Sequence, residues 1–262
     1  MKKVEKRVLI SYDDLCPYQC KHCYTLDIDR LDKSREIEEI VDSIEGAKFD
    51  IVYVSQRREN FIKQDQGIEL CEKVFERYKC NILIITRNVF TQHYIDRLKE
   101  LQRRMDKIGK RLFVAVSIFA TKSFALSENP NKVPSPYERI KFLEKMSQEK
   151  IETITLIRPV FPNSIVPIEE LYEIVDLCSK FSSCVVSSGL AVNDNILWRL
   201  GLKSEDFCYV DNMDYLEGAM EGKLRFVNVS RELSLLKQHC KKDKVKCFDH
   251  TMEAINFYLE KD

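Results

Sequence analysis

The chain has 262 residues, 44% of them hydrophobic, which is enough for one large α/β barrel or two small domains with a sizeable core. Its 42 basic and 42 acidic residues give a formal net charge of zero, which excludes the general positive field of a basic nucleic-acid-binding domain. No run of about eighteen apolar residues occurs, so we expect no membrane span.

Cysteine usage indicates the compartment of the protein. Ten cysteines would suggest disulfides in a small secreted domain, but the chain starts with a short apolar stretch that lacks a cleavage site. We therefore expect reduced thiols and a cytoplasmic location.

Six short apolar runs, rich in Val and Ile, recur along the chain. They are nearly continuous rather than alternating, as expected for parallel strands that are buried on both faces. The predicted strands cover residues 8–11, 51–55, 82–86, 112–119, 154–159 and 184–188.

Segments with helical period separate the predicted strands. Ser135, Pro136 and Glu138 form one clear helix start, with an N-cap, a proline at the first helical position and a capping-box acid. The alternating order predicts an open doubly wound sheet or a barrel, complete or partial, and periodicity does not choose between them. Apolar residues recur at helical spacing at Ile68, Cys71, Phe75, Tyr78, Tyr94, Leu98, Leu101, Met105 and Ile108.

The rhythm of strands stops after Trp198. The rest of the chain shows mostly helical spacing, and no Pro/Gly-rich linker separates it from the preceding part. We therefore predict a core of residues 1–200 and a helical C-terminal extension of residues 201–262 that packs on this core.

The loop after the first predicted strand carries the most informative motif. Cys16, Cys20 and Cys23 are separated by four and three residues, so their thiolates can converge on three corners of a cubic iron-sulfur cluster and leave the fourth iron open. A structural zinc site is the alternative. Zinc prefers four ligands in a closed tetrahedron, and His22 is the sole further His or Cys at short spacing.

The C-x3-C-x2-C spacing resembles the signature of the radical S-adenosylmethionine (radical SAM) superfamily. The resemblance implies a 4Fe-4S cluster on Cys16, Cys20 and Cys23, with S-adenosylmethionine bound at the open iron. It also implies reductive cleavage of that cofactor to a 5'-deoxyadenosyl radical, hydrogen abstraction from a substrate, and a one-electron reductant such as flavodoxin or ferredoxin. Members fold as a partial (β/α)6 TIM-like barrel of parallel strands. A non-catalytic zinc or iron-sulfur binding module stays open as the alternative function.

The same resemblance implies two contacts to S-adenosylmethionine. His22 takes the place of an aromatic residue that borders the adenine in this superfamily. Glu59 is the candidate for the amino group, although residues 55–60 lack the glycines of the usual Gly-Gly-Glu stretch. The structural alternatives are an exposed loop histidine and a surface glutamate.

The core segments are most similar to members of the spore photoproduct lyase type. Tyr24 follows the third cysteine as in those proteins, Arg87 replaces the lysine of their Ile-Thr-Lys-Ser stretch, and Ser117 matches a serine on their fourth strand. The resemblance implies that all three contact the cofactor, with Arg87 gripping its carboxylate through two bonds. A salt-bridged arginine and a strand-end serine are the structural alternatives.

Two later positions complete the predicted site. Arg158 precedes a Pro-Val-Phe-Pro segment that resembles the fifth strand of the same relatives, and its prolines predict that the chain leaves the sheet nearby. Arg158 would then be an anion contact at the barrel rim. Gly189, after the sixth run, would allow the backbone to approach the adenine.

The hydrogen donor of the lyase reaction has no counterpart in this chain. That donor is a cysteine near the end of the second strand, but no cysteine lies between Cys23 and Cys71. Tyr53, Tyr24 and Tyr12 are the candidate replacements. The substrate stays open among a nucleobase-bearing compound, a peptide and a small metabolite.

Two further groups of residues have both a functional and a structural interpretation. One predicts either a second metal site or buried helical thiols. The other predicts either a phosphate-contacting strip or the solvated face of a helix, and helical spacing favours the solvated face. The first group is Cys208, His239, Cys240, Cys247 and His250, and the second is Arg97, Lys99, Arg103, Arg104, Lys107, Lys110 and Arg111.

Overall fold

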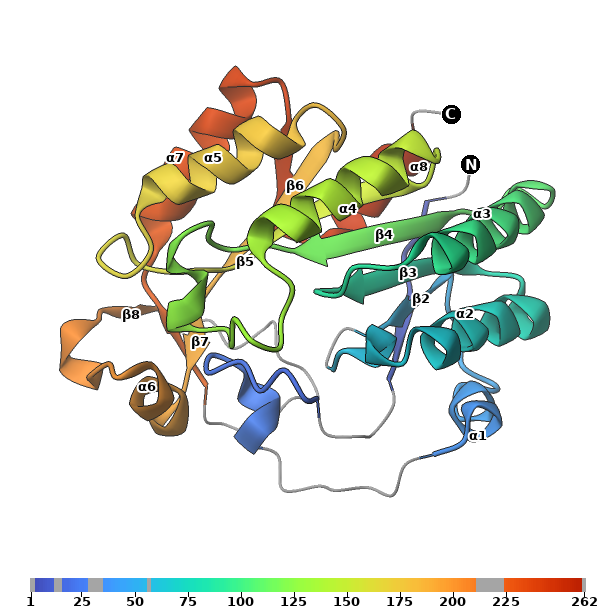
Figure 1. The fold of residues 1–262 in the computed structure, drawn as a ribbon, viewed down its shortest axis with the longest axis horizontal. Coiled ribbons are helices and arrows are strands. Elements are labelled where there is room, and N and C mark those ends of the chain that lie inside the picture. Colours follow the sequence, from blue (N-terminus) through green and yellow to red (C-terminus); the bar gives the residue numbers. More distant parts are fainter. Residues whose placement is uncertain (1–2, 12–15, 28–34, 56–57, 211–223, 261–262) are drawn as a thin grey trace.

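The computed structural model of the protein describes residues 3–11, 16–27, 35–55, 58–210 and 224–260. Its centre is a parallel sheet with the strand order β1-β2-β3-β4-β5-β6-β10 (Figure 1). These strands are Arg7–Ile10 (β1), Ile51–Val54 (β2), Asn81–Thr86 (β3), Leu112–Ser117 (β4), Glu152–Val160 (β5), Cys184–Gly189 (β6) and Lys246–Phe248 (β10).

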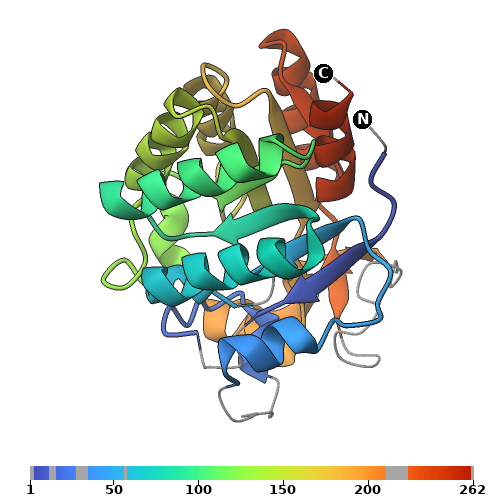
Figure 2. The same ribbon diagram turned by 90° about the vertical axis from the view of Figure 1, so that its right-hand side faces the viewer.

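Helices connect the successive strands and cover the sheet (Figure 2). The α/β class with a partial barrel is confirmed, and all six predicted strands are present at their expected places. The α-helices are Ile37–Asp42 (α1), Gln64–Tyr78 (α2), Gln92–Asp106 (α3), Pro136–Gln148 (α4), Ile168–Cys178 (α5), Asp194–Leu200 (α6), Ser230–Lys242 (α7) and Thr251–Leu259 (α8). Short 3-10 helices cover Tyr24–Asp27 (η1), Asn60–Ile62 (η2), Ser123–Leu126 (η3) and Ser204–Asp206 (η4).

The start of α4 forms as its sequence predicts. The Ser135 hydroxyl accepts from the amide of Glu138, and the Glu138 carboxylate accepts from the amide of Ser135 at 2.7 Å. Pro136 stands at the first helical position, where its missing N–H removes no intrahelical bond.

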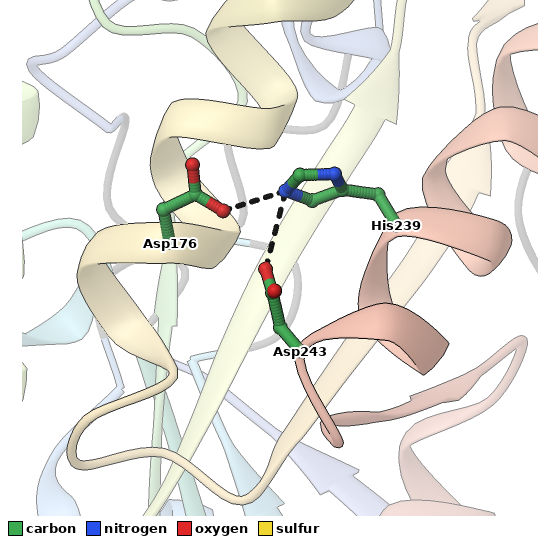
Figure 3. A group of neighbouring side chains, drawn as sticks. All are labelled: Asp176, His239 and Asp243. Atoms are coloured by element: carbon green, nitrogen blue, oxygen red, sulfur yellow. Dashed lines mark hydrogen bonds and ion pairs between the residues drawn. The ribbon is translucent and has the colours of Figure 1, made fainter.

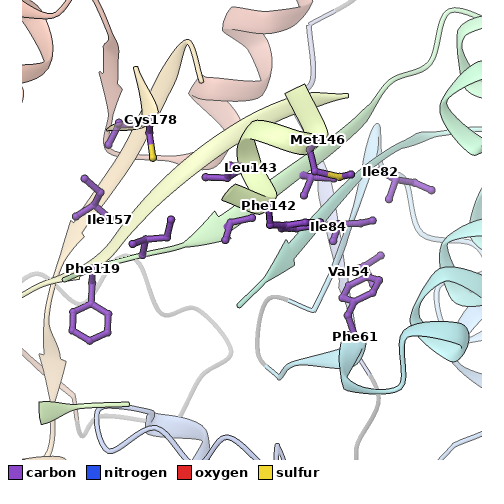
Figure 4. Close-up of a cluster of buried hydrophobic side chains, with 14 of the residues drawn as sticks. Val54, Phe61, Ile82, Ile84, Phe119, Phe142, Leu143, Met146, Ile157 and Cys178 are labelled. Atoms are coloured by element: carbon purple, nitrogen blue, oxygen red, sulfur yellow. The ribbon is translucent and has the colours of Figure 1, made fainter. Parts of the chain in front are cut away.

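The two faces of the sheet bury different side chains because successive residues of a strand point in opposite directions. Val54, Ile82 and Ile84 face the connecting helices, where Phe142 of α4 packs in the same cluster (Figure 4). The opposite face is covered by α8, which lies behind the sheet in Figure 1. Its residues Ala254, Ile255, Tyr258 and Leu259 are buried together with Tyr53, Leu83 and Phe113 of the strands.

The C-terminal part contains strands as well as the predicted helices. Residues Ala191–Val192 (β7), Arg225–Val227 (β9) and Tyr209–Val210 (β8) form a small antiparallel sheet, and β10 pairs in parallel with β6. The β10 segment, Lys-Cys-Phe, is too short and too polar to show as an apolar run. Helix α8 packs against one face of the central sheet, so part of the C-terminal extension shares a buried cluster with the core. The domain division at residue 200 stays a prediction.

Strand β5 runs through Pro159 and ends at Val160. The pairing register between β5 and β6 shifts between Ile157 and Val160, and this irregularity accommodates a residue that has no N–H to donate. The chain therefore leaves the sheet after Val160, one residue beyond the predicted strand end.

The loop after β4 is held by a carboxylate from a different layer. Glu170 of α5 is buried, and its Oε2 accepts from the amides of Thr121, Lys122 and Ser123 at 2.8, 2.7 and 3.0 Å. Burial opposes ionisation, but these bonds outweigh it and hold the pKa of Glu170 below its ordinary value of 4.5.

The substitution Glu170→Gln should reduce the free energy of unfolding by about 2 kcal/mol at pH 7, because the three amides lose a charged acceptor. A depressed folded-state pKa stabilises the fold above pH 4.5 and loses this effect as pH falls through the folded value. The difference between the two proteins should therefore shrink below pH 4.5 in urea titrations. The exposed neighbour Glu169→Gln is the control, and an equal loss there would contradict the assignment.

Candidate functional site

The predicted cluster loop lies between β1 and η1, at the edge of the sheet where the parallel strands have their carboxyl ends (Figure 1). One cavity at this edge is lined by Cys16, Cys20, Cys23, His22, Glu59 and Arg87. Side chains from three strand ends thus meet, as the parallel order of the strands requires.

The cysteine loop is fastened from two sides. The amide of Lys21 donates to the carbonyl of Ser127 at 2.7 Å. On the other side, Arg199 of α6 donates to the carbonyls of Lys21 and Cys23, both at 2.9 Å, and forms an ion pair with Asp27. Sequence reasoning did not identify Arg199, because nothing in its local pattern marks a residue that contacts a loop so distant in the chain.

The three thiols line one cavity, and thiolates are ligands of both iron-sulfur clusters and zinc. Burial raises the pKa of the Cys20 thiol to about 12 and also raises that of Cys16. These thiols therefore need a bound cation to ionise, and a 4Fe-4S group would supply that charge.

A glycine-like turn brings Glu59 to the cavity. Ser55 has a φ of 73°, a left-handed conformation that costs a residue with a Cβ about 1–2 kcal/mol. Its hydroxyl donates to the carbonyl of Arg58 and accepts from the amide of Asn60. These local bonds offset the strain, and the chain turns here without the glycines of the usual motif.

Glu59 reaches from the end of β2 to the end of β3. Its Oε1 accepts from the amide of Phe61 and the hydroxyl of Thr86 at 3.1 and 2.9 Å, and its Oε2 accepts from the amide of Arg87 at 2.6 Å. Burial raises the pKa of Glu59 despite these bonds. Because each carboxylate oxygen has two lone pairs, Oε2 keeps room for another donor such as an ammonium group.

His22 is held in a fixed orientation rather than exposed. Its Nδ1 contacts the hydroxyl of Ser127, and its Nε2 lies 3.4 Å from Nη2 of Arg87. A guanidinium only donates, so we assign the proton of the ring to Nδ1. Burial and the neighbouring charge of Arg87 lower the pKa of His22 to about 3, and the neutral ring packs edge-on against Phe119 and Phe161.

Arg87 belongs to a buried ionic network that the sequence did not reveal. Its Nε donates to Oε1 of Glu128 at 2.8 Å, and Glu128 also receives Nη2 of Arg139 at 2.5 Å. The side chains of Glu128 and Arg139 are completely buried. Arg139 also donates to the carbonyl of Ser117 at 2.7 Å. Buried charges persist only when they are paired, so this network fixes the ends of β3 and β4 relative to α4.

The substitution Arg139→Gln should lower the free energy of unfolding by about 3 kcal/mol, because it removes the principal counter-charge of a buried carboxylate. The control is Arg103→Gln, which alters an exposed ion pair on α3 and should cost less than about 0.5 kcal/mol. Chemical denaturation of both variants checks the difference, and equal losses would rule out a special role for the buried pair.

Four predicted cofactor contacts lie outside the cavity lining, namely Tyr24, Ser117, Arg158 and Gly189. The Ser117 hydroxyl donates to the carbonyl of Arg158 at 3.1 Å, and Arg158 donates to the carbonyl of Asp249 at 2.7 Å. A Cβ on Gly189 would stand 2.9 Å from Cγ2 of Val229. This close packing already requires a glycine, whereas the predicted approach to an adenine stays a prediction.

The tyrosines that are candidates for the hydrogen donor have different positions in the structure. Tyr53 is completely buried on the face covered by α8, and its hydroxyl lies 3.8 Å from the sulfur of Met252. Tyr24 begins η1 and is half-buried beside the cysteine loop. Tyr12 lies outside the described residues. Neither of the two described candidates lines the cavity, and Tyr24 directly follows Cys23 in the chain.

The predicted second metal site does not assemble among the described residues. Cys240 and Cys247 share a side-chain hydrogen bond, but Cys208 is exposed and His239 contacts two carboxylates instead. Nε2 of His239 lies 2.6 Å from Asp176 of α5 and 3.2 Å from Asp243 (Figure 3). These contacts join α5 to α7.

The basic strip on α3 is a solvated, ion-paired face. Arg97 pairs with Asp65 and Glu72, and Lys99 pairs with Glu149. Arg103, Arg104 and Arg111 also have acidic partners, Glu100, Glu76 and Asp106. For these residues the structure therefore supports the interpretation as a solvated face rather than a phosphate-contacting strip.

Comparisons with known proteins agree with the fold. No protein-family model and no curated protein matches the chain. Among solved structures, SuiB of Streptococcus suis bound to S-adenosylmethionine matches with a TM-score of 0.60 at 13% identity, over 92% of this chain and 49% of that one. The anSMEcpe enzyme with bound AdoMet and Cp18Cys peptide matches with a TM-score of 0.56 at 12% identity, over 92% of this chain and 63% of that one.

TYW1 with a lysine-pyruvate adduct matches with a TM-score of 0.53 at 13% identity, over 95% of this chain and 77% of that one. The chain spans about half the length of SuiB and less than two thirds of anSMEcpe. The fold is that of radical SAM enzymes, as the cysteine motif predicted. In the described part of the chain, every helix is too short or too polar to cross a bilayer.

Proposed function

We propose that the chain is a radical SAM enzyme, in which Cys16, Cys20 and Cys23 hold a 4Fe-4S cluster and S-adenosylmethionine binds at the open iron. One observation carries this proposal. The three thiols line a single cavity with Glu59 and Arg87 at the carboxyl edge of a radical SAM fold. The identity of 13% to SuiB supports the fold alone, so the activity rests on these residues.

The bound groups would supply the one-electron cleavage of a sulfonium, which gives methionine and a 5'-deoxyadenosyl radical that takes hydrogen from the substrate. The residues of the chain would bind and orient these groups. Glu59 offers a carboxylate oxygen to the amino group of the cofactor. The neutral ring of His22, backed by Phe119 and Phe161, forms an apolar wall that excludes water.

The substrate class is part of the proposal. The lyase-like core segments favour a nucleobase-bearing substrate, whereas anSMEcpe was captured with a peptide, which favours a peptide. Either substrate would enter at the cavity edge, because α8 packs against the other face of the sheet. A lyase or an oxidoreductase reaction is compatible with this entry.

We further propose flavodoxin or ferredoxin as the source of the electron, and a cytoplasmic location. All ten cysteines are free thiols in the structure, which suits a reducing compartment. A non-catalytic zinc module is the rival function. A closed zinc site needs a fourth ligand, and both ring nitrogens of His22 contact other residues, Ser127 and Arg87.

Anaerobic reconstitution should load the wild-type chain with roughly four irons and four sulfides, and dithionite should then drive formation of 5'-deoxyadenosine. The triple variant Cys16→Ala, Cys20→Ala, Cys23→Ala should lose both iron and product, because its cavity has no thiolate ligands. Iron and sulfide analysis together with chromatography of the nucleoside measures both.

The matched control is Cys208→Ala, which removes an exposed thiol outside the cavity and should leave iron and product unchanged. One zinc per chain without any nucleoside product would establish the rival module. Iron retained by the triple variant would show that other residues hold the metal.

A further inference from the structure

Arg87 is partly engaged by protein groups. Nε donates to Oε1 of Glu128 at 2.8 Å, and Nη2 lies 3.4 Å from Nε2 of His22. A guanidinium has five N–H donors, so these two contacts leave further N–H groups for a ligand. The two-bond contact to a carboxylate therefore stays a prediction, and the position of the positive charge is what the structure describes.

The position of the charged Arg87 side chain is fixed by its buried partner Glu128. Glu128 is completely buried, and Arg139, also completely buried, holds it through both carboxylate oxygens at 3.3 and 2.5 Å. The two guanidinium groups and the Glu128 carboxylate leave one unit of positive charge within this network, and the Glu59 carboxylate of the same cavity lies outside it. Since Arg139 lies deep and Arg87 lines the cavity with 27% of its side chain exposed, that excess charge faces the cavity.

The same cavity receives the thiols of Cys20 and Cys23. His22 lies between them in sequence and connects their loop to Arg87 and to Ser127, which directly precedes Glu128. The loop is bonded to this segment a second time through the Lys21 amide. Loop, arginine and buried carboxylate therefore form one rigid unit.

We propose that Arg87 is a fixed counter-charge for the iron-sulfur cluster, positioned by Glu128, and that it raises the midpoint potential of the cluster. This inference rests on the proposed function. A cluster with three thiolate ligands carries net negative charge, which increases when the cluster takes up an electron. A nearby cation in a site shielded from water stabilises the reduced form more than the oxidised form. Arg87 would thereby make the reduction by a flavodoxin or ferredoxin easier.

The test is an EPR-monitored redox titration of the reconstituted full chain without S-adenosylmethionine. Arg87→Gln should shift the midpoint potential to more negative values, and Arg87→Lys should restore most of the shift. Glu128 stays bonded to Arg139 in both variants, so the buried carboxylate remains compensated. Thermal unfolding confirms that each variant is folded before titration.

Arg97→Gln is the matched control. Arg97 has a similar exposed fraction, 25%, and two acidic partners, but it lies on α3 outside the cavity lining. This variant removes the same charge and should leave the potential unchanged. Binding of S-adenosylmethionine to Arg87→Gln is measured separately, because loss of a bidentate carboxylate contact would weaken it about tenfold or more.

An unchanged potential in Arg87→Gln overturns the inference. If binding of S-adenosylmethionine is then strongly weakened, Arg87 is a cofactor ligand, and if neither quantity changes, Arg87 has a structural role alone. A wild-type chain that assembles no cluster would instead overturn the proposed function. The iron content reveals that failure before any titration.

Discussion

The burial of the Glu128 carboxylate is the constraint on which the site depends. A carboxylate without exposure must be paired, and its two partners come from different elements, Arg87 after β3 and Arg139 in α4. Because Ser127 and Glu128 are adjacent, the same segment also fixes His22 and the amide of Lys21. One desolvated charge thus determines where the cysteine loop lies relative to the sheet. Such a network stabilises little by itself, but it specifies a single arrangement.

The parallel order of the strands explains why the other residues converge. Strands β1 to β3 end at one edge, so the loops after them are neighbours although they are distant in sequence. Glu59 makes this proximity rigid by accepting from Thr86 and from the amide of Arg87. The turn that presents Glu59 is held by the hydroxyl of Ser55, so the carboxylate reaches the cavity without a glycine at this turn.

Much of this could be predicted from sequence because the signals are local. Buried parallel strands show as continuous apolar runs, and three cysteines in one loop need no partner elsewhere to be recognised. Glu128 and Arg199 were missed for the opposite reason. Glu128 stands in a polar segment that is typical of a surface, and Arg199 is a single basic residue among apolar neighbours in a short helix. Only the tertiary fold buries the first and brings the second to the loop. The three residues of β10 were missed because pairing with β6, not composition, makes them a strand.

The packing of α8 limits where chemistry can take place. This helix buries Tyr53, Leu83 and Phe113 on one face of the sheet. Tyr53 therefore lies beneath the helix, and its hydroxyl contacts Met252. Under the proposed function, a substrate would reach the thiols at the carboxyl edge, where they line the cavity. Hydrogen transfer to or from the protein would then involve residues of the loops, not residues inside the sheet.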